Sequence, residues 1–151
     1  MHKNSIKIVC LVPSWTETLL EASVHVVGRT RFCVHPEQLV KNIPIVGGTK
    51  NIDIKTIQEI NPDLVLLDRQ ENTKEMAHQL VSLGFKLTIT NVTDFESLIH
   101  ACLELGNNLQ APKLIEIAER FKHLTNIDTA KFLKNIIIKR SEEHTSELQS
   151  R

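Results

Sequence analysis

Two short apolar segments, residues 6–12 (IKIVCLV) and residues 63–68 (DLVLLD), constrain the fold of this chain more than any other feature. The apolar residues in each segment are nearly continuous, whereas a strand with one face in water alternates apolar with polar residues. Each segment therefore predicts a strand that is buried on both faces. Such strands occur in parallel sheets that are covered by helices on both sides.

Helical patterns separate the predicted strands. After the first strand, Ser14 and Glu17 have the spacing of a capping box at the start of a helix. A second helix is predicted from Asp53 until Pro62 stops it, and a third ends at Gly84. Further predicted elements are a strand at 25–28, an extended segment at 43–48, a strand at 86–90, helices at 93–109 and 111–127, and a strand at 132–139. This alternation predicts an α/β fold: a Rossmann-like parallel-sheet lobe with helices on both faces.

Composition excludes several classes of partner. The chain has 18 basic and 18 acidic residues and 4% aromatic residues with no tyrosine, so nucleic acid is not an expected ligand. Its three cysteines, Cys10, Cys33 and Cys102, lie far apart and form no disulfide framework. The first apolar segment is too short to cross a membrane, and no cleavage site follows it. We therefore expect a monomer without membrane insertion, cytoplasmic as the sequence stands, or periplasmic or at the cell surface if another route exports it.

The last residues have a different origin from the rest. RSEEHTSELQS, residues 140–150, back-translates codon by codon into a sequence that resembles a short-read sequencing adapter. We therefore interpret residues 140–151 as an artefactual tail and leave them out of the fold prediction. The natural protein is then expected to continue beyond Lys139.

The predicted sheet also indicates where a ligand would bind. In open α/β sheets, ligands bind outside the carboxyl ends of the strands, where the strand order reverses. The segment GRTRFCVHP, residues 28–36, follows a predicted strand and lies at that edge. The candidate ligand-binding residues in the loops at this edge are Ser14, Trp15, Thr16, Arg29, Arg31, Phe32, Cys33, His35, Thr49, Lys50, Asp68, Arg69 and Asn72.

Three motifs along the chain resemble one known family. LVPSWTETLLEA, VVGRTRFCVHP and the segment DIKTIQEINPDLVLL are similar to the amino-terminal lobe of type III periplasmic binding proteins, the helical-backbone metal receptor superfamily. The resemblance implies two α/β lobes joined by one long helix, with a metal chelate such as a corrinoid or a ferric siderophore bound between them. It also implies a binding protein of ABC-type import, without a covalent cofactor, rather than an enzyme. The implied parts are a ligand-binding lobe at 1–110, a bridging helix at 111–130 and the first strand of a missing second lobe at 131–139.

Several candidate residues have a structural alternative. Cys33 and His35 could both reach one metal ion, or Cys33 could be a buried thiol beside a histidine at a turn. Trp15 could stack on a macrocycle or could cover the lobe's own core. The cations at this edge could bind the carboxylates of a chelate, or Asp68 and Glu71 could neutralise them.

Two positions depart from the family pattern. Asp68 stands where cobalamin-binding members have an aromatic residue, and Lys74 aligns with the glutamate through which exported members contact a permease. A truncated substrate-binding protein for a metal chelate is the function that the resemblance implies. A cytoplasmic chelate carrier or sensor on the same fold is an alternative, as is an enzyme that depends on Cys33 and His35.

Overall fold

One parallel sheet organises the chain. The structure is a computed structural model that describes residues 5–124, so the predicted strand at 132–139 and the adapter-like tail lie outside the described residues. Within the described range, four parallel strands pair in the order β2–β1–β3–β4, as predicted for an α/β fold. They are β1 (Ile8–Cys10), β2 (Val26–Arg29), β3 (Leu64–Asp68) and β4 (Leu87–Thr90).

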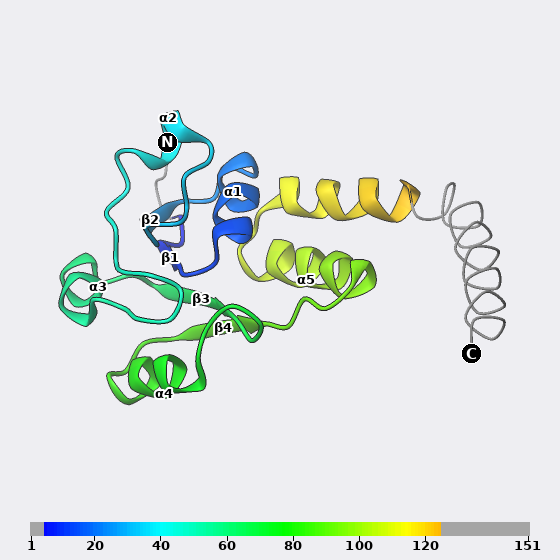
Figure 1. The fold of residues 1–151 in the computed structure, drawn as a ribbon. Coiled ribbons are helices and arrows are strands. Elements are labelled where there is room, and N and C mark those ends of the chain that lie inside the picture. Colours follow the sequence, from blue (N-terminus) through cyan, green and yellow to red (C-terminus); the bar gives the residue numbers. More distant parts are fainter. Residues whose placement is uncertain (1–4, 125–151) are drawn as a thin grey trace, which may run out of the picture.

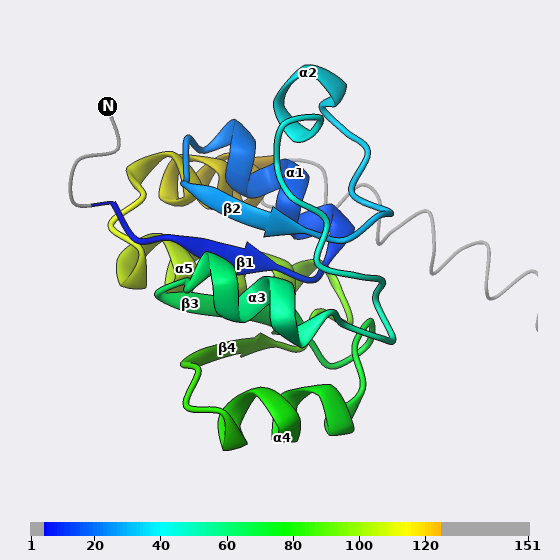
Figure 2. The same cartoon turned by 90° about the vertical axis from the view of Figure 1, so that its left-hand side faces the viewer.

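Helices cover both faces of the sheet (Figure 1, Figure 2). The helices α1 and α5 lie on one face together with a further helix at residues 112–124, whereas α3 and α4 lie on the other. The bounds are α1 (Pro13–Glu21), α2 (Glu37–Val40), α3 (Ile54–Ile60), α4 (Lys74–Ser82) and α5 (Phe95–Asn108). The helix at 112–124 falls within the predicted bridging helix, whose role stays a prediction.

Burial on both faces explains the apolar character of the strands. Ile8 and Cys10 of β1 pack with α1, α5 and the helix at 112–124, whereas Val9 and Leu11 pack with α3 and α4. Full burial of an aliphatic side chain stabilises a fold by about 1.5–3 kcal/mol relative to its exposure. A polar side chain at any of these four positions would lie in one of the two cores. The sequence of the strand is therefore continuously apolar and does not alternate with polar residues.

The start of α1 differs from the prediction. The helix begins at Pro13, one residue before the predicted cap. Its N-cap residue is Val12, whose apolar side chain cannot accept a capping hydrogen bond. Proline suits the first helical position because its ring fixes φ and its nitrogen carries no hydrogen. Ser14 therefore lies inside the first turn, and the predicted capping box of Ser14 and Glu17 is wrong.

The predicted starts of α3 and α5 are confirmed, whereas α4 begins at Lys74, three residues after the start of the predicted segment. The Asp53 carboxylate accepts a bond from the Thr56 amide at the start of α3, and Asp94 accepts one from the Ser97 amide at the start of α5. These bonds lower the pKa of both carboxyl groups. Gly84 follows the end of α4 at a φ of 88°, as a glycine after a helix does. The four-residue helix α2 was not predicted.

The helix at 112–124 lies very close to α5. A Cβ atom on Gly106 of α5 would come within 2.6 Å of Ile115 Cγ1, 3.2 Å of the Ile115 amide nitrogen and 3.3 Å of the Ala111 carbonyl oxygen. Only a glycine allows this approach, and Leu114, Ile117 and Ala118 of the second helix join the same core as Leu105. The lobe and the helix at 112–124 therefore share one hydrophobic core.

We predict that Gly106→Ala lowers the free energy of unfolding by about 1–3 kcal/mol, because the added methyl group overpacks a backbone contact. An alanine in an unobstructed helix would instead stabilise it. Urea denaturation measures the change, with the exposed neighbour Asn107→Ala as the matched control. A Gly106→Ala protein as stable as the control would contradict the close packing.

Candidate functional site

The carboxyl ends of the strands point to one edge of the sheet, where the loops with the candidate residues gather (Figure 2). Burial divides these residues into two layers, the surface layer and the buried layer. The surface layer comprises Ser14, Arg31, Phe32, His35, Lys50 and Arg69. The buried layer comprises Trp15, Thr16, Arg29, Cys33, Asp68 and Asn72, with Thr49 half-buried.

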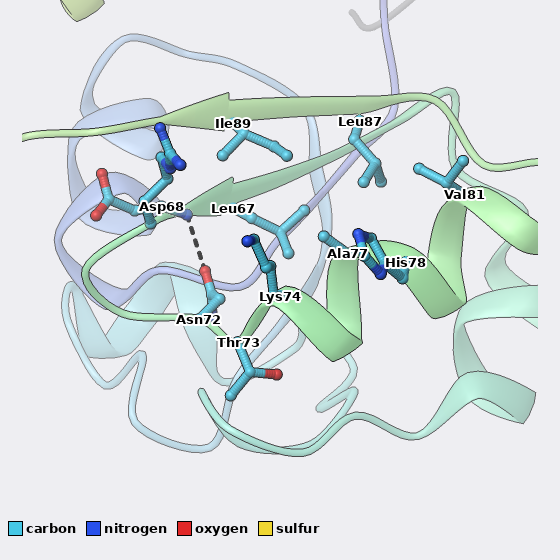
Figure 3. A pocket seen from close by; sticks show the side chains of 11 residues that line it. Leu67, Asp68, Asn72, Thr73, Lys74, Ala77, His78, Val81, Leu87 and Ile89 are labelled. Atoms are coloured by element: carbon cyan, nitrogen blue, oxygen red, sulfur yellow. Dashed lines mark hydrogen bonds between the residues drawn. The ribbon is translucent and has the colours of Figure 1, made fainter.

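Asn72 connects three segments of the buried layer. Its side-chain nitrogen donates to the Leu11 carbonyl oxygen (3.0 Å) at the end of β1 and to the Thr49 carbonyl oxygen (2.9 Å). Its side-chain oxygen accepts from the Asp68 amide (2.9 Å), as drawn in Figure 3. One buried side-chain amide therefore satisfies backbone groups of three separate segments.

Asp68 joins the ends of β3 and β4. Its carboxylate accepts bonds from the Thr90 hydroxyl (2.6 Å), the Val92 amide (3.1 Å) and the Gln70 amide (2.8 Å). All three donors are neutral, so this carboxylate organises the loops. The arrangement does not support the alternative in which Asp68 neutralises the cations of this edge.

Trp15 belongs to the core beneath the edge. Its side chain is 3% exposed, and its indole nitrogen donates to the Thr90 hydroxyl (3.0 Å). This position favours the alternative in which Trp15 covers the lobe's own core. One edge of the side chain still lines a pocket of about 250 Å³ that also includes Ser14, Gln70 and Phe121.

Cys33 and His35 lie in different surroundings. The Cys33 side chain is 1% exposed, and its sulfur lies 3.1 Å from the Thr16 hydroxyl and 3.2 Å from the Thr30 hydroxyl. His35 is exposed. This arrangement favours the buried-thiol alternative over a shared metal ion. No three metal-binding side chains gather anywhere within residues 5–124.

Arg29 is also a buried structural residue. Its guanidinium donates to the Ile43 carbonyl oxygen (3.0 Å) and to the Cys33 carbonyl oxygen (3.0 Å). These bonds fix the loop after β2 against the extended segment before Val46, as the backbone pairing of Arg29 with Ile45 also does. Arg29 is therefore not part of the surface that a ligand could contact.

The surface layer brings cations and one aromatic ring together. The Arg31 guanidinium lies over the Phe32 ring at 5.7 Å from its centroid, and a Cβ atom on Gly48 would come within 3.3 Å of Arg31 Nη1 and 3.5 Å of Phe32. Lys50 in the same glycine-containing loop donates from Nζ to the Glu71 carbonyl oxygen (2.6 Å). The loops after β2 and after Val46 therefore form one continuous surface with a positive charge.

A larger pocket, of about 620 Å³, flanks this edge between α4 and the strands β3 and β4 (Figure 3). Its floor is aliphatic, and Asp68, Arg69, Asn72 and Lys74 lie at its end near the candidate site. Among these, only Lys74 was not a candidate ligand-binding residue. Sequence reasoning missed the structural roles of Thr30 and Thr90, for which the available signal was a hydroxyl at the end of a strand.

We predict that Asn72→Ala lowers the free energy of unfolding by about 3 kcal/mol, because it leaves the buried Leu11 carbonyl, the half-buried Thr49 carbonyl and the Asp68 amide without this partner. Urea denaturation measures the loss. The control is Asn91→Ala, whose exposed side chain accepts a single bond from Gln70 and should cost less than about 0.5 kcal/mol. Equal stability of the two variants would contradict the connecting role of Asn72.

Solved structures share this fold. The chain is similar to the periplasmic vitamin B12 binding protein BtuF of Vibrio cholerae, with 19% identity and a TM-score of 0.77 over 87% of this chain and 52% of that chain. A periplasmic heme binding protein from Pseudomonas aeruginosa has 19% identity and a TM-score of 0.71, over 83% of this chain and 46% of that chain. S. aureus IsdE complexed with heme has 16% identity and a TM-score of 0.74, over 85% of this chain and 50% of that chain. The chain thus spans about half the length of these proteins.

No curated protein matches the chain by sequence. Among the described residues, no helix combines the length and apolar character needed to cross a lipid bilayer. The Vibrio cholerae and Pseudomonas aeruginosa proteins are described as binding proteins. A family model described as periplasmic binding protein matches residues 8–123, which is most of the chain. The chain therefore belongs to the periplasmic binding protein family.

Proposed function

We propose that this lobe forms one wall of a binding site for a metal chelate in a substrate-binding protein of an ABC importer. The observation that supports this proposal best is the surface layer at the carboxyl edge of a lobe of this family, where Arg31 lies over Phe32 against the loop of Gly48 that also carries Lys50. Related folds include proteins for vitamin B12 and heme, which are both metal chelates. A corrinoid, a heme or a ferric siderophore is accordingly the ligand class that we propose.

The chemistry of the surface layer suits a chelate that carries carboxylates. Arginine binds a carboxylate with two parallel hydrogen bonds, and a lysine ammonium adds a point charge. The Phe32 ring is 55% exposed, so it offers a flat apolar face to a macrocycle. Ser14 is exposed in the first turn of the nine-residue helix α1, where free amide groups favour a negative charge.

The proposed binding site also includes a second lobe. Because the solved relatives are about twice as long as this chain, a second lobe is proposed to close over the same surface. An ABC permease is the proposed partner, and the periplasm or the cell surface is the proposed location. A chelate held by one wall only should bind with a Kd of about 10 µM to 1 mM, since half of the contacts are missing.

We predict that ferric heme, whose propionates are carboxylates, quenches the fluorescence of Trp15, the single tryptophan of the chain, at micromolar to millimolar concentrations. The double variant Arg31→Ala with Lys50→Ala should weaken this binding about tenfold, because two charge-assisted contacts are lost. The titration is repeated with cyanocobalamin and with a ferric citrate complex to rank the ligand classes.

Lys86→Ala is the matched control, because Lys86 is exposed and directly precedes β4, at the amino ends of the strands. This variant should bind heme as the unchanged chain does. Equal losses in the control and the double variant would contradict a site at the carboxyl edge. Absence of quenching by all three ligands up to millimolar concentration would contradict the proposed function.

A further inference from the structure

The pocket of about 620 Å³ between α4 and the strands β3 and β4 includes none of the side chains that we propose to contact a chelate. Its volume is in the range of small-molecule sites, which is about 300–1,000 Å³. Aliphatic side chains from three elements point into this space (Figure 3). They are Leu67 of β3, Leu87 and Ile89 of β4, and Ala77 and Val81 of α4. The pocket is therefore a second candidate ligand site.

Two of these aliphatic side chains are strongly exposed to water. Val81 of α4 is 59% exposed, and Ile89 of β4 is 50% exposed. Among the described residues β4 is the last strand of the sheet, so no further strand lies beside Ile89. Ala77 lies one turn before Val81 on α4, and its small side chain leaves the space of the pocket unfilled. An alkyl chain in this space would remove the apolar walls from water, which is favourable.

The end of the pocket at the carboxyl edge carries positive charge. Lys74 is the first residue of α4 and lies on the same helix face as Ala77 and Val81, because residues three and seven positions apart share a face. Arg69 follows β3 at the same end. Within residues 5–124, no hydrogen bond or ion pair occupies either cationic side chain. The Asp68 carboxylate in the lining is 3% exposed and accepts from three neutral donors, so it leaves the two charges without a counter-ion.

We propose that this pocket binds an amphipathic monocarboxylate, such as a medium-chain fatty acid. The carboxylate pairs with Lys74 and Arg69, and the alkyl chain extends between α4 and β4 toward Val81. Apart from the exposed imidazole of His78, no ring lines the pocket. A flexible alkyl chain therefore suits it better than a planar macrocycle, which would stack on an aromatic face such as that of Phe32. The site is separate from the chelate site and does not depend on the function proposed above.

The test is a titration of the full chain with decanoate below its micelle concentration, followed by heteronuclear NMR of the backbone amides. We expect a saturable site with a Kd of about 0.05–2 mM, as is usual for a ligand with few non-hydrogen atoms. The largest shifts should occur at Ala77 and Ile89. Decyltrimethylammonium, which has a similar alkyl chain and a positive charge, should bind about tenfold more weakly. Equal affinities for the two probes, or largest shifts at Phe32, would overturn the proposal.

Two variants separate the alkyl chain from the charge. Ala77→Leu should weaken decanoate binding about tenfold or more, because the larger side chain fills the space of the alkyl chain. Lys74→Gln should weaken it about fivefold, the effect of one exposed ion pair. The matched controls are Gln79→Leu, exposed on α4 outside the pocket, and Lys55→Gln, exposed in the first turn of α3, and both should bind as the unchanged chain does.

The amide spectra also show whether each variant is folded, and Lys74→Gln decides the test if Ala77→Leu is not. Undiminished binding of decanoate to a folded Ala77→Leu protein would overturn the proposal. Equal losses in a variant and its control would do the same.

Discussion

The carboxyl edge of this lobe depends on the side chain of Asn72. Parallel strands leave their final carbonyl and amide groups at one edge, where loops have to satisfy them away from water. Asn72 does this for the ends of β1 and β3 and for Thr49, while Asp68 does it for the ends of β3 and β4. These two side chains position the loops that carry Lys50 and Arg69, whereas Arg29 fixes the loop after β2 that carries Arg31, Phe32 and His35. The shape of the candidate site therefore follows from buried hydrogen bonds.

The sequence predicted the architecture because burial on both faces has a direct compositional consequence. Continuous apolar residues at 6–12 and 63–68 indicated parallel strands, and Asp53 marked the start of α3. The prediction was wrong at the start of α1, where the helix begins at Pro13 and not after a cap at Ser14. A capping motif and a proline compete for the same position, and spacing alone does not rank them.

The sequence also located the candidate site, but it did not predict which of the residues are buried and which lie at the surface. Arg29 and Arg31 have the same chemistry and nearly the same position, yet one binds backbone carbonyl groups in the interior and the other lies over Phe32 at the surface. Likewise, the partner nearest to the Cys33 sulfur is a hydroxyl of α1 rather than the neighbouring histidine. Such differences come from the packing of loops against one another, which residue type does not encode.

The close contact at Gly106 has a mechanical consequence. Because Ile115 lies directly against Gly106 of α5, the helix at 112–124 can neither slide nor rotate against the lobe without breaking the shared core. A force applied along that helix would be transmitted to the sheet as a movement of one solid body. Any adjustment of the lobe to a ligand is then left to the loops of the carboxyl edge.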